Sequence, residues 1–361
     1  MKVKIGDLTK IRTGKLDANA SSEDGQYPFF TCSKEPLKIS TYSYDCECVL
    51  VAGNGDLNVK YYNGKFDAYQ RTYIIEDNGS GKLFMPYLYY FMEGYVEELR
   101  KQAIGGVIKY IKLGNLTDAL IEIPSVDEQK AIVDILEKAK NVLDMRNEEI
   151  SKLDDLIKAR FVEMFGEYYK NHINEKQLDE ICDFIDYRGK TPEKSESGIP
   201  LITAKNVKDN RFSIEPQEFI PEENYDDVMT RGIPRVNDVL FTTEAPLGNV
   251  CRIPDVYERF CVGQRLITMQ PHTDVINPEY LEHALTSAEF QEKMWQKSSG
   301  STVKGIRSKL LVLLTIPVPP IELQNQFRDF LKQVDKSKVV VQKSLDETQQ
   351  LFDSLMQKYF G

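Results

Sequence analysis

The sequence predicts an α+β protein in which two strand-rich globular domains are joined by two long helices, which pair as an antiparallel coiled coil with pseudo-two-fold symmetry. Two observations lead to this fold class. Residues 105–166 and 300–361 repeat one pattern without a gap at an offset of 195 (300 − 105), and each copy carries a long, one-sided apolar stretch. We therefore predict a globular domain at 1–125, a helix at 126–166, a second globular domain at 167–320 and a second helix at 321–361.

The repeat is carried by identical residues and by a matched order of parts. Each copy contains a basic loop with glycine, a short apolar strand that ends in proline, and a long helical pattern that closes on Phe-Gly. A period of this length is too long for a solenoid, so a domain together with its helix has been duplicated. The identical pairs include Gly105/Gly300, Lys109/Lys304, Pro124/Pro319, Gln129/Gln324 and Gly166/Gly361.

The helical stretches have apolar residues spaced alternately three and four apart, which places a narrow stripe along one face. Each helix is expected to span about 57 Å, and a helix this long and one-sided needs a partner. The alternative is that each helix serves only the core of its own domain, but the duplication favours an antiparallel pair between two end domains. The predicted packing residues are Ile132, Leu136, Leu143, Ile150, Leu153 and Ile157 in the first helix, and Phe327, Leu331, Val341, Leu345, Phe352 and Leu355 in the second.

The two globular regions have short alternating apolar runs separated by Gly, Asn and Asp, which predict strands. The second region repeats the order of the first with different residues between the runs. The predicted strands are 27–30, 48–51 and 69–75 in the first region, and 199–202, 238–241 and 263–267 in the second. Two divergent domains on a common scaffold would have this pattern.

The formal net charge of −10 argues against a nucleic-acid partner unless basic residues gather locally. They gather at corresponding places of the repeat, around Gly105–Gly106 and around Ser298–Thr302, where small residues let a loop approach phosphates. A solvated basic loop without a ligand is the alternative for each loop, and the presence of two such loops leaves both interpretations open. The candidate phosphate contacts are Lys101, Lys109, Lys293, Lys297, Lys304 and Arg307.

Composition excludes several classes of protein. No apolar run approaches the length of a membrane span and the N-terminus lacks a signal-peptide pattern, so we expect a soluble, cytoplasmic protein. The six cysteines form no Cys-x-x-Cys pair and the three histidines lie far from them in sequence, so we expect reduced thiols and no metal site.

Enzyme motifs are incomplete. The stretch 277–280 (NPEY) resembles an adenine-methyltransferase tetrapeptide, but Glu279 stands where a second proline is expected and no glycine-rich cofactor loop accompanies it. Gly189-Lys190-Thr191 lacks the upstream glycine of a phosphate loop. Glu128 and Lys130 are better explained as first-turn residues of a helix than as part of a metal-nuclease site with Asp118. We therefore expect no catalytic residue.

Several stretches resemble the specificity subunits of type I restriction and modification systems. Two are the proline-led helix starts at 123–130 (IPSVDEQK) and 318–324 (VPPIELQ), and two are the ends of the helical patterns at 160–166 (RFVEMFG) and 356–361 (MQKYFG). The others are the pairs Gln70-Arg71 and Gln264-Arg265 and the stretch 189–192 (GKTP). Each motif is loose, but their order and spacing make the resemblance specific, and it covers essentially the whole chain.

The resemblance implies a subunit without catalysis of its own, whose two target-recognition domains each read half of a bipartite site on double-stranded DNA. It also implies that the helices fix the separation of the half-sites and dock two methyltransferase subunits, and that motor-nuclease subunits can join. No cofactor is then expected in this chain, since S-adenosylmethionine and ATP would be bound by the partner subunits. Arginine and glutamine are the favoured residues for guanine and adenine, so the candidates for base or phosphate contacts are Gln70, Arg71, Arg188, Lys190, Gln264 and Arg265.

Two other classes of function remain open at this point. One is a coiled-coil protein scaffold that never binds DNA. The other is a self-sufficient DNA-modifying enzyme, such as a nuclease or a fused methyltransferase. For Arg71 and Arg265 a purely structural role at a strand end is as good an interpretation as a DNA contact.

Overall fold

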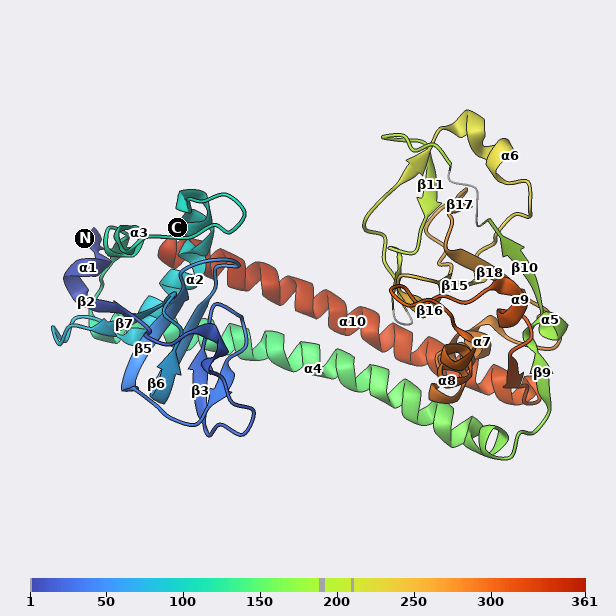
Figure 1. Ribbon diagram of the computed structural model, residues 1–361, viewed down its shortest axis with the longest axis horizontal. Helices are drawn as coiled ribbons and strands as arrows, with labels where there is room; N and C mark the ends of the chain where they lie inside the picture. Colours follow the sequence, from blue (N-terminus) through green and yellow to red (C-terminus); the bar gives the residue numbers. More distant parts are fainter. Residues whose placement is uncertain (1, 188–191, 209–210) are drawn as a thin grey trace. The chain divides into compact units, whose positions relative to one another are not determined.

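The structure is a computed structural model that describes residues 2–187, 192–208 and 211–361 (Figure 1). It divides into two compact units, the first made of Met1–Glu149 and Val341–Gly361 and the second of Ile150–Val340. Each long helix is thus shared between the units, whereas the sequence predicted separate helical segments. The reason is that the two ends of each helix are buried in different cores.

The first unit is built on a six-stranded sheet with the order β2-β7-β5-β6-β3-β4. All neighbours are antiparallel except β3 and β6, which are parallel through Phe29 and Asp67. The short strands β1 (Lys2–Lys4) and β8 (Leu120–Glu122) form a separate antiparallel pair. The strands of the large sheet are β2 (Thr9–Thr13), β3 (Tyr27–Phe30), β4 (Leu37–Ile39), β5 (Tyr44–Ala52), β6 (Val59–Ala68) and β7 (Thr72–Asp77).

Helices cover one face of this sheet (Figure 1). The helix α2 (Met85–Gln102), which has a proline in its first turn, buries Leu88 and Met92 in a core that also contains Val49 and Ile75 from the sheet. The same core includes Leu136 from the start of α4 (Val126–Lys170), with the end of α10 (Ile321–Phe360) packed against it. The short helices of the unit are α1 (Ile5–Leu8), α3 (Leu113–Thr117) and the 3-10 turn at Ala18–Ala20.

The second unit has a four-stranded antiparallel sheet, β10-β18-β15-β16, and a three-stranded sheet, β14-β11-β17. The four-stranded sheet consists of β10 (Cys182–Asp186), β18 (Leu266–Pro271), β15 (Val239–Thr243) and β16 (Leu247–Arg252). The other consists of β14 (Phe219–Ile220), β11 (Ile199–Ile202) and β17 (Cys261–Val262). Two further pairs are β9 (Glu175–Gln177) with β19 (Thr315–Pro317) and β12 (Val207–Lys208) with β13 (Arg211–Phe212).

The core of the second unit mirrors that of the first. Phe161 and Phe165 from the end of α4 meet Phe327 from the start of α10, with ring centroids 5.5 and 5.4 Å apart. Each unit therefore joins one end of α4 to the opposite end of α10, which makes the two helices antiparallel. The other helices are α5 (Leu178–Ile181), α6 (Tyr225–Val228), α7 (Pro278–Leu285), α8 (Ala288–Lys297) and α9 (Ser308–Leu311), with a 3-10 turn at Glu222–Asn224.

The duplication extends to topology. The order β2-β7-β5-β6 of the first unit corresponds to β10-β18-β15-β16 of the second, and β3-β4 corresponds to β11-β14. The parallel pairing of β3 with the end of β6 recurs as the parallel pairing of β11 with β17. The pairs β1-β8 and β9-β19 also correspond. The fold class predicted from the repeat, two strand-rich domains with two long helices, is confirmed.

Three predicted boundaries were wrong in detail. The helix α4 continues past Gly166 to Lys170, because Phe161, Phe165 and Tyr169 follow at four-residue spacing and pack into the second core. The predicted strands at 69–75 and 263–267 begin later, at Thr72 and Leu266. The pairs Gln70-Arg71 and Gln264-Arg265 consequently lie in turns that precede β7 and β18.

Candidate nucleic-acid interface

The basic loop has the same backbone conformation in both units. In the first unit the N–H groups of Ile104 and Tyr110 each donate to the carbonyl of the other, at 3.0 and 2.9 Å. In the second unit Ser299 and Gly305 form the equivalent pair, with both bonds at 2.9 Å. Each pair closes a short loop at its base and presents the residues between them to solvent, including Lys109 and Lys304.

A glycine makes this loop possible. Gly105 has φ +122° and Gly300 has φ +114°, a region that residues with a side chain rarely adopt. A Cβ atom at Gly105 would lie 2.6 Å from the carbonyl oxygen of Ile108, and one at Gly300 would lie 2.0 Å from that of Val303. The glycines at 105 and 300 are therefore required by the turn itself.

One residue in each unit joins the basic loop to the Gln-Arg turn. In the first unit the N–H of Gly53 donates to the carbonyl of Arg71 at 2.8 Å, while the carbonyl of Gly53 accepts from Ile111 at 2.9 Å. In the second unit Thr243 makes the same bonds, to Arg265 at 3.0 Å and from Ile306 at 3.1 Å. The basic loop and the Gln-Arg turn are far apart in sequence. In both units they are bonded to the same residue and therefore lie close together.

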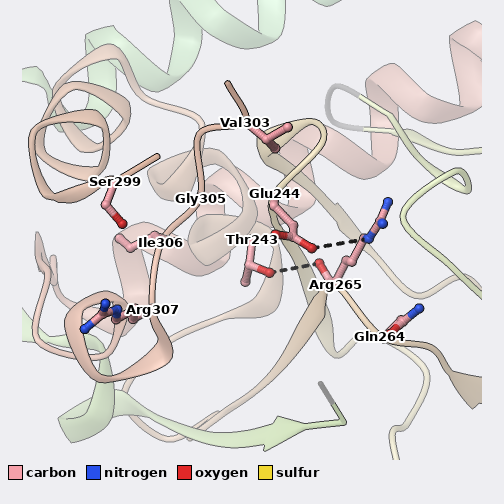
Figure 2. A pocket seen from close by; sticks show the side chains of 9 residues that line it. All are labelled: Thr243, Glu244, Gln264, Arg265, Ser299, Val303, Gly305, Ile306 and Arg307. Atoms are coloured by element: carbon pink, nitrogen blue, oxygen red, sulfur yellow. Dashed lines mark hydrogen bonds and ion pairs between the residues drawn. The ribbon is translucent and has the colours of Figure 1, made fainter. Parts of the chain in front are cut away.

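The second unit has a cavity at this junction (Figure 2). Arg265 and Gln264 come from the turn before β18, while Arg307 follows the basic loop. The structure therefore brings three predicted contact residues together around one hollow, with Lys304 exposed in the adjoining loop. The lining consists of Thr243, Glu244, Gln264, Arg265, Ser299, Val303, Gly305, Ile306 and Arg307.

The corresponding residues of the first unit are also at the surface. Gln70, Arg71 and Lys109 are exposed, and the amide of Gln70 donates to Asp17 at 2.9 Å. Both units therefore present an arginine, a glutamine and a lysine from the same two loops. Planar arginine and amide groups can bind base edges or phosphates, and lysine binds phosphates as a point charge.

Other predicted contacts are placed less favourably. Lys293 bridges Glu175 at 3.0 Å and Glu289 at 2.9 Å. Burial opposes its charge, but the two carboxylates outweigh burial and raise its pKa, so this lysine serves an internal ion pair. Lys101 forms an exposed pair with Glu98 at 3.4 Å, and Lys297 is exposed at the end of α8. Arg188 and Lys190 lie outside the residues that the structure describes.

The predicted helix-packing residues are all buried or half-buried. Leu136, Leu143, Ile157, Phe327, Leu331 and Val341 are buried, and Ile132, Ile150, Leu153, Leu345, Phe352 and Leu355 are half-buried. Lys338, which interrupts the stripe of the second helix, forms an ion pair with Asp154 of α4. Packing inside each unit therefore covers the apolar stripes of the two long helices.

One group of possible metal ligands occurs among the described residues, namely His172, Glu175 and Glu289. The Lys293 ammonium contacts both of these carboxylates and supplies the positive charge there. Burial raises the pKa of Cys48, Cys182, Cys251 and Cys261, which keeps these thiols protonated and poorly suited as nucleophiles or metal ligands. Among the helices of the described ranges, none is long and apolar enough to cross a membrane.

Sequence analysis missed Gly53, Thr243 and Glu244. Thr243 and Glu244 follow a predicted strand that resembles many others. Their role depends on hydrogen bonds to segments that lie far along the chain, so no local pattern could reveal it. Once the strand order is known, a comparison of the two repeats shows that Gly53 and Thr243 are equivalent positions.

Comparisons with known proteins agree with this duplicated architecture. The chain is 38% identical to the type I restriction enzyme EcoDI specificity subunit of Escherichia coli over 156 residues, which make up 43% of this chain and 34% of that protein. This match thus spans about a third of that relative. The chain is also 22% identical to the MjaVIII specificity subunit of Methanocaldococcus jannaschii over 98% of its own length and 90% of that protein.

Among solved structures, the S subunit of a type I restriction-modification system from M. genitalium superimposes with a TM-score of 0.60 at 19% identity, covering 100% of this chain and 96% of that one. This likeness concerns the fold. Two stretches, residues 1–154 and 171–348, match the model of the type I restriction modification DNA specificity domain, and together they include most of the chain. With this domain present twice, on the two units that share a topology, the chain belongs to the type I restriction-modification DNA specificity family.

Proposed function

We propose that this chain is the non-catalytic DNA-reading subunit of a type I restriction-modification complex. Each globular domain reads one half of a bipartite site on double-stranded DNA, and the helices fix the separation of the halves and dock two methyltransferase subunits. S-adenosylmethionine and ATP are then bound by partner subunits, and a motor-nuclease subunit can join the same complex. Membership of the family supports the DNA-recognition role.

The observation that carries this proposal is the repeated junction of basic loop and Gln-Arg turn. Both domains present it with the same backbone hydrogen bonds and the same arginine, glutamine and lysine. The overall charge of −10 has little effect on a local contact with DNA, because exposed charges separated by more than about 8 Å are largely screened at physiological salt. Local cations can therefore still contact phosphates.

Roles within this surface follow from side-chain chemistry. We assign phosphate contacts to Lys109, Lys304 and Arg307, with Lys101 and Lys297 at the periphery, and we leave out Lys293 because two carboxylates neutralise it. We assign base contacts to Arg71 and Arg265 with the neighbouring Gln70 and Gln264. Arg188 and Lys190 remain candidates from the sequence.

The test is a base-resolution map of N6-methyladenine in the source cells, with the gene intact and with the gene deleted. Loss of one interrupted, asymmetric motif on deletion is the expected result. An unchanged map in cells that express the methyltransferase would contradict the proposal. It would favour a coiled-coil scaffold without DNA binding, or an enzyme of another kind.

A second test addresses the phosphate contacts directly. Lys109→Ala should weaken binding to duplexes of any sequence and reduce the salt dependence of affinity by about one unit of slope. Lys10→Ala is the matched control, since Lys10 is also exposed in the first unit but lies on the edge strand β2. Equal effects of the two substitutions would remove the basic loop from the interface.

A further inference from the structure

We propose that Glu244 and Arg265 act together to read a G·C base pair in the half-site of the second domain. This inference rests on the proposed function and names the base pair that one part of the interface recognises. Arg265 Nε lies 3.3 Å from Glu244 Oε1, and both side chains are half exposed, at 52% and 48% (Figure 2). The pair belongs to the cavity where the Gln-Arg turn meets the basic loop.

Stability does not explain this ion pair. Pairs with this much exposure contribute about 0–1 kcal/mol, because water screens the attraction and both side chains lose freedom. The backbone that carries the pair is also unfavourable, since Arg265 has φ +72° and Ala245, next to Glu244, has φ +42°. Such conformations in residues other than glycine persist where the surroundings hold them, and they are concentrated at functional sites.

The surroundings do hold Arg265. Its carbonyl accepts from the N–H of Thr243 at 3.0 Å and from the Thr243 hydroxyl at 3.2 Å. The Glu244 carboxylate then restrains the guanidinium from the side. The arginine therefore has a defined position at both its backbone and its side chain, as a base-reading residue requires.

The first domain differs at this position. Asn54 follows Gly53 as Glu244 follows Thr243, and the two residues form equivalent bridges, to Tyr110 and to Gly305. The first domain thus places a neutral amide where the second places a carboxylate. Because Asn54 and Glu244 follow residues that make matching backbone hydrogen bonds, the difference in their side chains points to the sequence that each domain recognises.

A carboxylate beside the arginine disfavours a phosphate as the ligand, because the two anions repel each other. A base edge fits better. Guanine offers two adjacent acceptors, N7 and O6, to a guanidinium, and its partner cytosine offers the N4 amino group, which a carboxylate accepts. The ion pair engages Nε of Arg265, so the terminal nitrogens can donate to guanine while a Glu244 oxygen accepts from cytosine.

The experiment is the N6-methyladenine map in cells whose only copy of the gene carries Glu244→Gln or Arg265→Lys. Each substitution keeps approximate size but removes the carboxylate charge or the planar guanidinium. We expect the methylated motif to become degenerate at one G·C position, the same position for both variants, with the rest of the motif intact. In binding assays, discrimination at that position should fall about tenfold or more.

Control variants make the result specific. Lys304→Ala should reduce methylation over the same motif without changing its sequence, because phosphates carry no base identity. Arg71→Lys should affect only the other half-site, which identifies the half that belongs to the second domain. Glu244→Asn introduces the residue of the first domain and provides a second variant if Glu244→Gln accumulates poorly.

An unchanged motif in both Glu244 variants would overturn the inference, as would degeneracy at an A·T position or in the half-site that Arg71→Lys alters. These outcomes differ from failure of the proposed function, in which deletion of the gene leaves the whole map unchanged.

Discussion

The side-chain amides of Gln129 and Gln324 make the same three hydrogen bonds in the two units. Gln129 accepts from the N–H of Phe84 at 2.8 Å and donates to the carbonyls of Lys82 and Pro124 at 2.8 and 2.9 Å. Gln324 accepts from the N–H of Asn277 at 2.8 Å and donates to the carbonyls of Val275 and Pro319 at 3.1 and 2.8 Å. Both glutamines are fully buried. Each one ties the start of a long helix to the segment that enters an earlier helix of its unit, α2 in the first unit and α7 in the second.

Replacement of either glutamine by leucine should destabilise its unit, because it leaves one N–H and two carbonyls, in buried or partly buried hydrogen bonds, without these partners. The expected loss is about 3 kcal/mol for each variant, from unsatisfied groups that cost about 1–3 kcal/mol each. Urea unfolding measures the loss as a lower midpoint. Gln350→Leu is the control, since Gln350 is exposed on α10. Equal midpoints for Gln129→Leu and Gln350→Leu would contradict this account.

Gly105→Ala should impair DNA binding without unfolding the domain. The added Cβ would meet the carbonyl of Ile108 at 2.6 Å in a backbone with φ +122°, so the loop must change shape. We expect weaker binding in a gel-shift assay, with an unchanged circular dichroism spectrum. Gly106→Ala is a matched control, because a Cβ there would have open space around it. A neutral result for Gly105→Ala would show that the loop conformation does not matter for binding.

The second unit should lose stability on mild acidification through His283. Burial lowers the pKa of this side chain from 6.5 to about 4, and the nearby charges of Arg252 and Lys338 act in the same direction. The unfolded chain then takes up a proton below about pH 6.5, which the folded unit does not accept until about pH 4. The free energy of unfolding should therefore fall between these two values, by up to about 3 kcal/mol.

His283→Phe tests this pH dependence. The ring of His283 packs edge-on against Phe327 at 5.3 Å, so phenylalanine can take its place among aromatic neighbours. Urea midpoints at pH 7, 5.5 and 4.5 should fall less steeply in this variant than in the wild-type chain. Parallel curves would mean that His283 titrates alike in the folded and unfolded states.

The ion pair of Lys338 and Asp154 should couple the two long helices in the second unit. Asp154→Lys places two cations together and should lower the unfolding midpoint, while the exchange Asp154→Lys with Lys338→Asp should restore it. The expected coupling is below about 1 kcal/mol, because the Asp154 side chain is 54% exposed. A double-mutant cycle isolates this coupling. Additive single effects would show that the charges do not interact.

Much of the architecture could be predicted from short-range patterns. The stripes from Ile132 to Ile157 and from Phe327 to Leu355 indicated the long helices, and the proline-led stretch at 123–130 marked the start of α4. There the Glu128 carboxylate accepts from the Ser125 N–H at 2.9 Å. The end of α4 was placed too early, because the burial of Phe165 and Tyr169 that extends the helix depends on the second core. The site was predicted in part, as the Gln-Arg pairs and the lysine loops.

The sequence by itself determined that this protein has two related halves, two long amphipathic helices and two basic glycine loops, since repeats, helical periodicity and glycine turns are properties of neighbouring residues. Only the tertiary structure decided that each loop lies beside a Gln-Arg turn through Gly53 or Thr243, that Lys293 is held by two carboxylates, and that Glu244 restrains Arg265. The physical reason is that hydrogen bonds and ion pairs between distant segments depend on strand order and side-chain geometry, which residue spacing does not encode.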